Sequence, residues 1–236
     1  RSSQGDVAVG RNAYFVGATP SKHLTFVADA CVGCHMTLGW DPKAEVGAYA
    51  ADGYAPSATN HYFKVDAKMC GRCHGDSIAE GVEFAYATGL AALDQAAIDR
   101  FLQTLPASFD VKGSYTSGSS TVDKYVTVQR ANVAAVTAFA GTSSGPQFSL
   151  TFTAPVNDPN AASGTVSALN VVTPNLFQVG STTVRIYASA GIFQKAGWNR
   201  ALVANDGSSG IHNPSFVSSV LQATAAQLRA AGPGTL

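Results

Sequence analysis

Charged residues are scarce in this chain of 236 residues: Asp, Glu, Lys and Arg make up 13% of it, and their formal charges cancel. That share is about half the usual one. The sequence contains no basic run that would form a basic face, which argues against nucleic acid as a partner. It also lacks a run of about 18 apolar residues, so we expect no segment to span a membrane. A surface with few charges is poorly protected against self-association.

The sequence starts at Arg1, without a methionine and without an apolar signal core. We therefore expect a mature form from which an export signal has been removed. Apolar residues nevertheless make up 46% of the chain, which is enough for a sizeable core in one large domain or two modest ones.

Cysteine is equally rare, and the four cysteines all belong to two copies of the pattern Cys-x-x-Cys-His. The copies are Cys31, Cys34 and His35 in the first, and Cys70, Cys73 and His74 in the second. The pattern is typical of c-type haem attachment, in which two thiols bind the porphyrin and the histidine is the proximal iron ligand. We predict two covalently bound haem c groups. A four-cysteine zinc site or two disulfides is the alternative, but neither explains a histidine after each pair.

Haem c is attached outside the cytoplasm, so the motifs themselves imply export, and no cysteine is left for another disulfide or a lipid anchor. Three histidines remain as candidates for the distal positions: His23, His61 and His212. The two methionines, Met36 and Met69, adjoin the haem motifs on tethers too short to reach the opposite face. Bis-histidine ligation is therefore expected on both irons.

The chain offers three imidazoles for two distal positions, so one of them would be idle. His61 can reach the first haem, which lies upstream of it, and His212 would return from the C-terminal segment. If each such histidine binds a haem whose motif precedes it in the sequence, as proposed for His61, then His23 would serve a haem upstream of the first. This chain has no motif for such a haem. That reasoning suggests ligation in trans, with one subunit completing the haem of its neighbour.

An α+β fold is expected, with an irregular dihaem-binding region containing short helices, an antiparallel β-sandwich of immunoglobulin-like architecture and a C-terminal helix. The expected domains are 1–105 for the haems, 106–190 for the sandwich and 191–236 for a segment that returns to the haem region. Residues 1–20 suggest an extended arm. The apolar pattern after them predicts helices over 78–88 and 94–104, separated at Gly89, with Asp94 as the N-cap of the second.

Strands are predicted where alternating Thr-, Val- and Ser-rich stretches lie between Gly, Asn and Pro clusters. Their ranges are 108–115, 122–128, 133–139, 147–153, 165–172 and 182–188. No Cys-Trp-Cys spacing of a true antibody-type domain accompanies them. Asn213 as N-cap and Pro214 at the first helical position predict the start of the C-terminal helix.

Two regions carry a resemblance to a known family, roughly 20–75 and 195–230. Trp198-Asn199, the loop Asp-Gly-Ser-Ser-Gly and the segment Gly210–Phe216 with Val220-Leu221 resemble the closing segment of outer-surface decahaem-type cytochromes of metal-reducing bacteria. The resemblance implies that His212 is a distal haem ligand. The pairing of a histidine with a following Cys-x-x-Cys-His is also similar to that family, whose split-barrel domains the expected sandwich resembles. Those proteins carry many more haems than the two expected here.

The hypothesis that follows is an electron-transfer protein and not an enzyme, located extracellularly or at the cell surface, or alternatively in the periplasm. With only two haems, long-range conduction would require self-assembly, as in extracellular cytochrome filaments. Expected partners are copies of the same chain, other redox proteins or extracellular electron acceptors. One rival is a dihaem peroxidase or reductase, which needs one open iron. Another is a monomeric periplasmic shuttle, which normally shows a charged docking patch.

Overall fold

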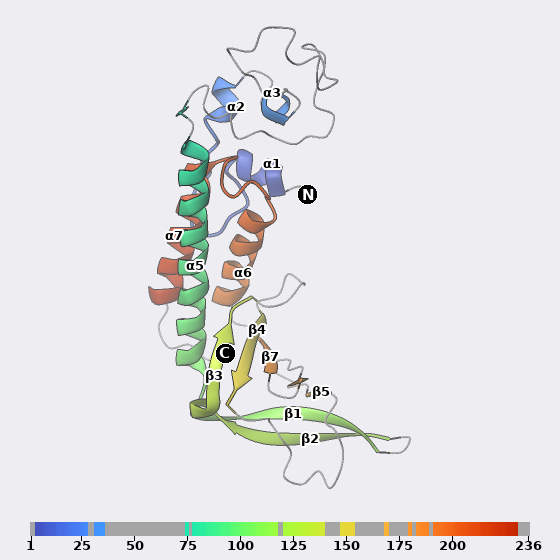
Figure 1. The fold of residues 1–236 in the computed structure, drawn as a ribbon. Helices are drawn as coiled ribbons and strands as arrows, with labels where there is room; N and C mark the ends of the chain where they lie inside the picture. The colour runs from blue at the N-terminus through green and yellow to red at the C-terminus, as the bar shows by residue number, and fades with distance from the viewer. Residues whose placement is uncertain are drawn as a thin grey trace. The chain divides into compact units, whose positions relative to one another are not determined.

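The computed structural model describes residues 3–27, 31–35, 74–75, 77–117, 120–139, 147–153, 168–169, 179–180, 183–188 and 191–230 (Figure 1). These residues combine α-helices with two small antiparallel sheets, which confirms the α+β class. The helices are α1 (Ser3–Ala8), α2 (His23–Phe26), α3 (Cys31–His35), α5 (Ile78–Thr104), α6 (Gly191–Ala204) and α7 (Pro214–Ala230). None of the described helices combines the length and apolar character needed to cross a bilayer.

The described strands form a three-stranded sheet in the order β2-β1-β5 and a four-stranded sheet in the order β3-β4-β7-β6. Their bounds are β1 (Ser108–Ser117), β2 (Ser120–Gln129), β3 (Val133–Thr137), β4 (Gln147–Phe152), β5 (Ala168–Leu169), β6 (Val179–Gly180) and β7 (Thr183–Tyr187). Each predicted strand overlaps one of these, and β6 is the strand that the sequence does not predict. The immunoglobulin-like sandwich is not shown by these strands.

Helix α5 is one continuous helix of 27 residues, so the predicted interruption at Gly89 is wrong. A Cβ placed on Gly89 would lie 3.0 Å from the Cδ1 atom of Leu221, so the glycine permits close packing against α7. Asp94, predicted as an N-cap, instead lies inside α5 and accepts two hydrogen bonds from the guanidinium of Arg200, at 2.7 and 3.0 Å. Both sequence signals for a helix boundary therefore reflect contacts with other helices.

The N-terminal residues 1–20 differ from the expected extended arm, because Ser3–Ala8 forms helix α1. The Val7 side chain is fully buried, and its carbonyl oxygen accepts a hydrogen bond from the side chain of Asn213. Gly10 then reverses the chain with a positive φ of 63°. The contacts that fix this helix come from more than 200 positions away, so local sequence periodicity does not reveal it.

Helix α6 is absent from the sequence prediction as well. Its residue Asn199 is completely buried, although asparagine usually marks a turn or a surface. The amide of Asn199 accepts from the backbone nitrogen of Tyr14 and donates to the Tyr14 carbonyl and the Thr224 hydroxyl. These bonds satisfy the buried polar group and hold the segment around Tyr14 in place.

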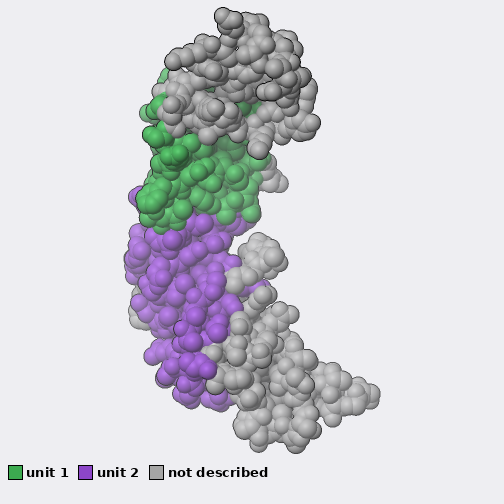
Figure 2. Space-filling view, viewed as in Figure 1, with its two compact units in different colours: residues 1–12, 17–88, 202–219 green, residues 13–16, 89–201, 220–236 purple. Residues whose placement is uncertain are grey.

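The chain divides into two compact units, shown in Figure 2. Unit 1 comprises residues 1–12, 17–88 and 202–219, and unit 2 comprises residues 13–16, 89–201 and 220–236. The boundaries fall within α5, α6 and α7, so each of these helices contributes residues to both units.

The core of unit 2 is built around stacked aromatic rings. Phe101 of α5 and Phe148 of β4 stack with centroids 4.2 Å apart and planes 4° from parallel. Phe193 of α6 meets both rings edge-on, with its centroid 5.2 Å from that of Phe148. Within β4, Phe148 and Leu150 are completely buried while Ser149 is only partly buried, so the predicted alternation of this strand is confirmed.

Asn213 joins the start of α7 to the N-terminal residues within unit 1. Its Oδ1 accepts a hydrogen bond from the Phe216 nitrogen at 3.2 Å, which confirms the predicted N-cap. Its Nδ2 donates to the carbonyl oxygens of Val7 and Thr19, at 3.1 and 2.7 Å. One buried amide thus satisfies three backbone groups.

Replacing Asn213 with alanine should lower the free energy of unfolding by about 2–3 kcal/mol, because it removes a helix cap and the two hydrogen bonds that the buried amide donates to Val7 and Thr19. Denaturant unfolding followed by circular dichroism measures the change. Asn205→Ala is the matched control at an exposed position of the same unit, where a change within about 0.5 kcal/mol is expected. Equal effects of the two substitutions would contradict this role of Asn213.

Candidate functional site

The described residues include four of the five histidines, all in unit 1, and the structure brings these four together as two pairs. His23 belongs to α2 and His35 to α3, His74 lies four positions before the start of α5, and His212 lies in the loop before α7. His61 and the second pair of predicted haem-attachment cysteines, Cys70 and Cys73, lie outside the described residues.

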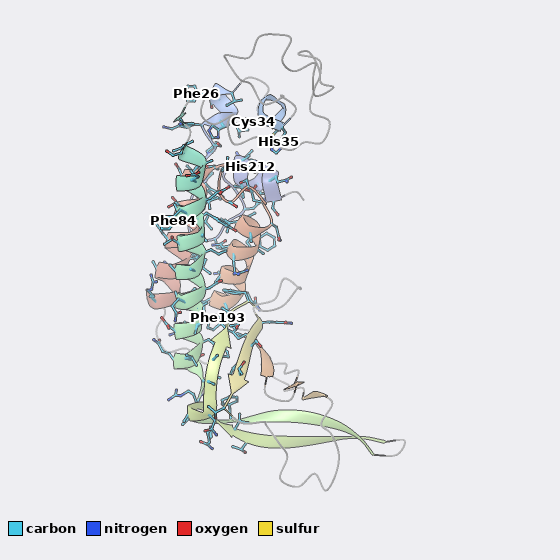
Figure 3. All side chains as sticks on the ribbon, in the orientation of Figure 1. Phe26, Cys34, His35, Phe84, Phe193 and His212 are labelled. Atoms are coloured by element: carbon cyan, nitrogen blue, oxygen red, sulfur yellow. The ribbon has the colours of Figure 1, made fainter. Side chains whose placement is uncertain are left out.

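His35 and His212 form the first pair, although 177 positions separate them in the sequence. Their Nε2 atoms are 3.4 Å apart, and their ring centroids are 5.7 Å apart with planes inclined by 47° (Figure 3). The two imidazoles thus present the same kind of nitrogen to a common point. His35 closes the first Cys-x-x-Cys-His motif, and His212 is the residue that the family resemblance implies as a distal ligand.

The loop that carries His212 is held by hydrogen bonds of its own residues. The Ser208 hydroxyl oxygen accepts from the backbone nitrogen of His212 at 3.1 Å. Gly207 and Gly210 have positive φ angles of 72° and 91°, a backbone region that glycine enters without steric cost. The sequence Asp-Gly-Ser-Ser-Gly therefore folds into a tight loop that fixes the backbone of His212.

Asp206 orients the ring of His212, and sequence reasoning did not identify it as part of the site. Its Oδ1 lies 2.7 Å from the His212 Nδ1, and its Oδ2 accepts a short hydrogen bond from the Ser208 hydroxyl. Since a carboxylate only accepts, Nδ1 of the neutral ring carries the proton and Nε2 keeps its lone pair toward His35. The available signal was an acidic residue six positions before a candidate ligand within a turn-rich loop.

His23 and His74 form the second pair. Their ring centroids are 5.9 Å apart, with planes at 74°. Burial, followed by the charges that the neighbouring His74 and His212 would carry when protonated, lowers the pKa of His23 below its ordinary value of 6.5. A neutral imidazole at neutral pH is the form that binds a metal. The structure thus places His23 beside His74, the residue predicted as the proximal ligand of the second motif, in the same chain.

The first motif forms the short helix α3, with Cys31, Cys34 and His35 at spacings of three and four residues. Such spacings place all three side chains on one face of a helix. Cys31 is exposed and Cys34 is partly buried, and neither forms a disulfide within the described part of the chain. Among the described residues, no group of three or more His, Cys, Asp and Glu side chains is close enough to hold a metal ion.

These residues fit a haem iron between two imidazoles. Such an iron would separate the two ligating nitrogens by about 4 Å, twice a metal–imidazole bond of about 2 Å. The distance of 3.4 Å between the Nε2 atoms of His35 and His212 is slightly shorter, so a modest opening would admit the metal. Two cysteines on the helix face of His35 would supply the thioether attachment.

Comparison of the chain with protein-family models, with curated protein sequences and with solved structures gave no match. The assignment of the site consequently depends on its residues and their geometry.

Proposed function

We propose that this chain is a dihaem c-type cytochrome that carries electrons outside the cytoplasm. The observation that carries the proposal is the 3.4 Å approach of two imidazole Nε2 atoms, one of them in a Cys-x-x-Cys-His motif and the other oriented by Asp206. When bound, haem supplies the one-electron couple of its iron, so that it can accept an electron from one redox partner and pass it to another. The polypeptide supplies attachment, axial ligands and orientation.

The first haem would be held by four side chains. Cys31 and Cys34 would form the thioether links, His35 would be the proximal ligand and His212 the distal ligand. Phe26, three positions after His23 on α2, is 79% exposed. Because His23 is the distal ligand proposed below for the second haem, this apolar side chain would form part of the wall of that second site, where the porphyrin would cover it.

The second haem would be attached through Cys70 and Cys73, with His74 as the proximal ligand and His23 as the distal ligand. His61 then becomes the surplus imidazole. Both irons would be fully ligated within one chain, so the sharing of His23 between subunits is not needed. Any association of subunits would rest on surface contacts instead of a shared ligand.

Two pairs of imidazoles favour electron transfer over the peroxidase or reductase alternative. A catalytic haem needs an open coordination position for its substrate, whereas an iron with two histidine ligands has none. His23 close to His74, and His212 close to His35, would occupy both distal positions. The proposed protein therefore accepts and donates electrons without binding a substrate at iron.

A self-assembling extracellular filament remains the proposed setting for this function, with the sheets of unit 2 forming an immunoglobulin-like shell. The scarcity of charge supports association, as does the exposed aromatic side chain of Phe84, which is 75% accessible. Electron microscopy and light scattering of the exported protein under native conditions test this setting. A protein that stays monomeric at all concentrations would contradict the filament and favour the monomeric electron shuttle.

Mass spectrometry of the exported chain is expected to give the polypeptide mass plus two haem groups, with a c-type band in the pyridine haemochrome assay. Replacing both Cys31 and Cys34 with serine should remove one haem and leave the other, because the two motifs attach separate groups. Cys70 and Cys73 replaced in the same way form the matched control and should also retain one haem. An unmodified wild-type polypeptide would overturn the proposed function.

A further inference from the structure

Asp206 is a buried carboxylate whose hydrogen-bond partners are an imidazole and a hydroxyl group. Its side chain is completely inaccessible, and a charge in such a place is costly unless hydrogen bonds compensate for it. Within the described structure its partners are the Nδ1 of His212 on one oxygen and the hydroxyl of Ser208 on the other. No lysine or arginine of the described residues forms an ion pair with it. The negative charge is therefore directed mainly at the imidazole.

A carboxylate bonded to the far nitrogen of a ligating imidazole does more than orient the ring. It draws the Nδ1 proton toward itself and makes Nε2 a stronger electron donor to a bound metal. A stronger axial donor stabilises ferric over ferrous iron, so it lowers the reduction potential. His212 has such a partner at 2.7 Å.

The second imidazole pair lacks this arrangement in the described part of the chain. The Ser21 hydroxyl accepts a hydrogen bond from the backbone nitrogen of His23, not from its ring. The described contact of the His23 ring is with His74, and no carboxylate of the described residues is hydrogen-bonded to it. The two candidate distal ligands thus differ in the charge placed behind them.

We infer that Asp206 is a positioning residue that sets the donor strength of His212, so that the haem held by His35 and His212 has the lower reduction potential of the two. This inference rests on the proposed function. Unequal potentials would favour electron transfer from the first haem to the second, since the electron would move to the haem of higher potential. Ser208 moderates the effect, because its hydrogen bond withdraws electron density from the carboxylate.

The test is a redox titration of the complete exported protein, followed in the visible spectrum, for the wild type and two substitutions. Asp206→Asn keeps an acceptor for Nδ1 but removes the charge, so one redox wave should shift to a more positive potential while the other stays. Ser208→Ala leaves the carboxylate without its second donor, so the same wave should shift in the opposite, negative direction. Asp99→Asn, an exposed carboxylate on α5, is the control for charge alone and should move neither wave.

Electron paramagnetic resonance should show two low-spin haems in every variant, with changed g values for one of them in Asp206→Asn. Waves that stay in place in both Asp206→Asn and Ser208→Ala, or that move together by equal amounts, would overturn the inference. If one haem of the Asp206→Asn variant loses its His212 ligand and becomes high-spin, Ser208→Ala provides the test. A negative shift of one potential in Ser208→Ala then supports the inference, and a positive shift or none contradicts it. The haemochrome assay distinguishes failure of the proposed function from failure of this inference. A wild-type protein without haem c contradicts the proposed function. Two bound haems whose potentials do not change in the variants contradict only the role of Asp206.

Discussion

If the protein binds the two haems proposed above, replacing His212 with alanine is expected to convert one of them from a six-coordinate low-spin centre to a high-spin centre. The His212 Nε2 faces that of His35, and no other described imidazole shows the same approach to His35. The vacated position would take a weaker ligand such as water. The potential of that haem should rise by on the order of a hundred millivolts, within the roughly 0.8 V range that axial ligands control. Optical and electron paramagnetic resonance spectra of the oxidised protein measure the change.

His23→Ala is the matched control for this experiment, because it removes the other candidate distal imidazole. It should change the second haem and leave the first in its original state. Replacing both residues should give two high-spin haems, and the covalent haem content should stay at two, because the cysteines are untouched. A His212→Ala protein whose spectra equal those of the wild type would refute the proposed pairing, and His61 would then become the leading candidate for the first iron.

The sequence predicts the strands well because the signal for a strand is local. Alternation in Phe148–Thr153 places apolar side chains on one face, and the structure buries Phe148 and Leu150 accordingly. The N-cap at Asn213 is equally local, since an asparagine side chain reaches the nitrogen three residues later. How the strands are arranged in space depends on contacts between distant segments, and the predicted sandwich is correspondingly not shown.

The helices show the opposite case, in which distant contacts override local signals. Gly89 and Asp94 resemble a helix boundary, but Gly89 provides room for Leu221 and Asp94 pairs with Arg200. Helix α6 escapes prediction because a buried Asn199 interrupts its apolar pattern. A single sequence does not reveal which glycine or polar residue has such a partner.

The same distinction between local signals and contacts of distant segments applies to the candidate site. The Cys-x-x-Cys-His motif and the candidacy of His212 come from residue types and short spacings. Which imidazole lies opposite which motif is a property of the fold. The pairing of His23 with His74 differs from the expectation that each histidine binds a haem whose motif precedes it, which suggested a neighbouring subunit. The sequence alone does not identify Asp206 as a partner of His212 for the same reason, because its role depends on the geometry of the loop and on its burial in the fold.

Replacing Phe148 with alanine is expected to lower the free energy of unfolding by about 3–5 kcal/mol, the usual cost of deleting a fully buried phenylalanine. The ring stacks on Phe101 and receives Phe193 edge-on, so its loss removes apolar contacts and leaves a cavity among aromatic neighbours. Denaturant unfolding followed by far-ultraviolet circular dichroism measures the change.

Phe84→Ala is the control of the same chemistry on α5, and it should change the free energy of unfolding by no more than about 0.5 kcal/mol, because that ring is 75% exposed. Phe148 belongs to unit 2 and the imidazole pairs belong to unit 1, so the visible spectrum of folded Phe148→Ala protein should equal that of the wild type. Equal losses of stability in the two variants would show that the aromatic cluster does not form the core. A changed haem spectrum in Phe148→Ala alone would mean that axial ligation depends on the packing of unit 2, and the imidazole pairs of unit 1 would then not suffice to hold the irons.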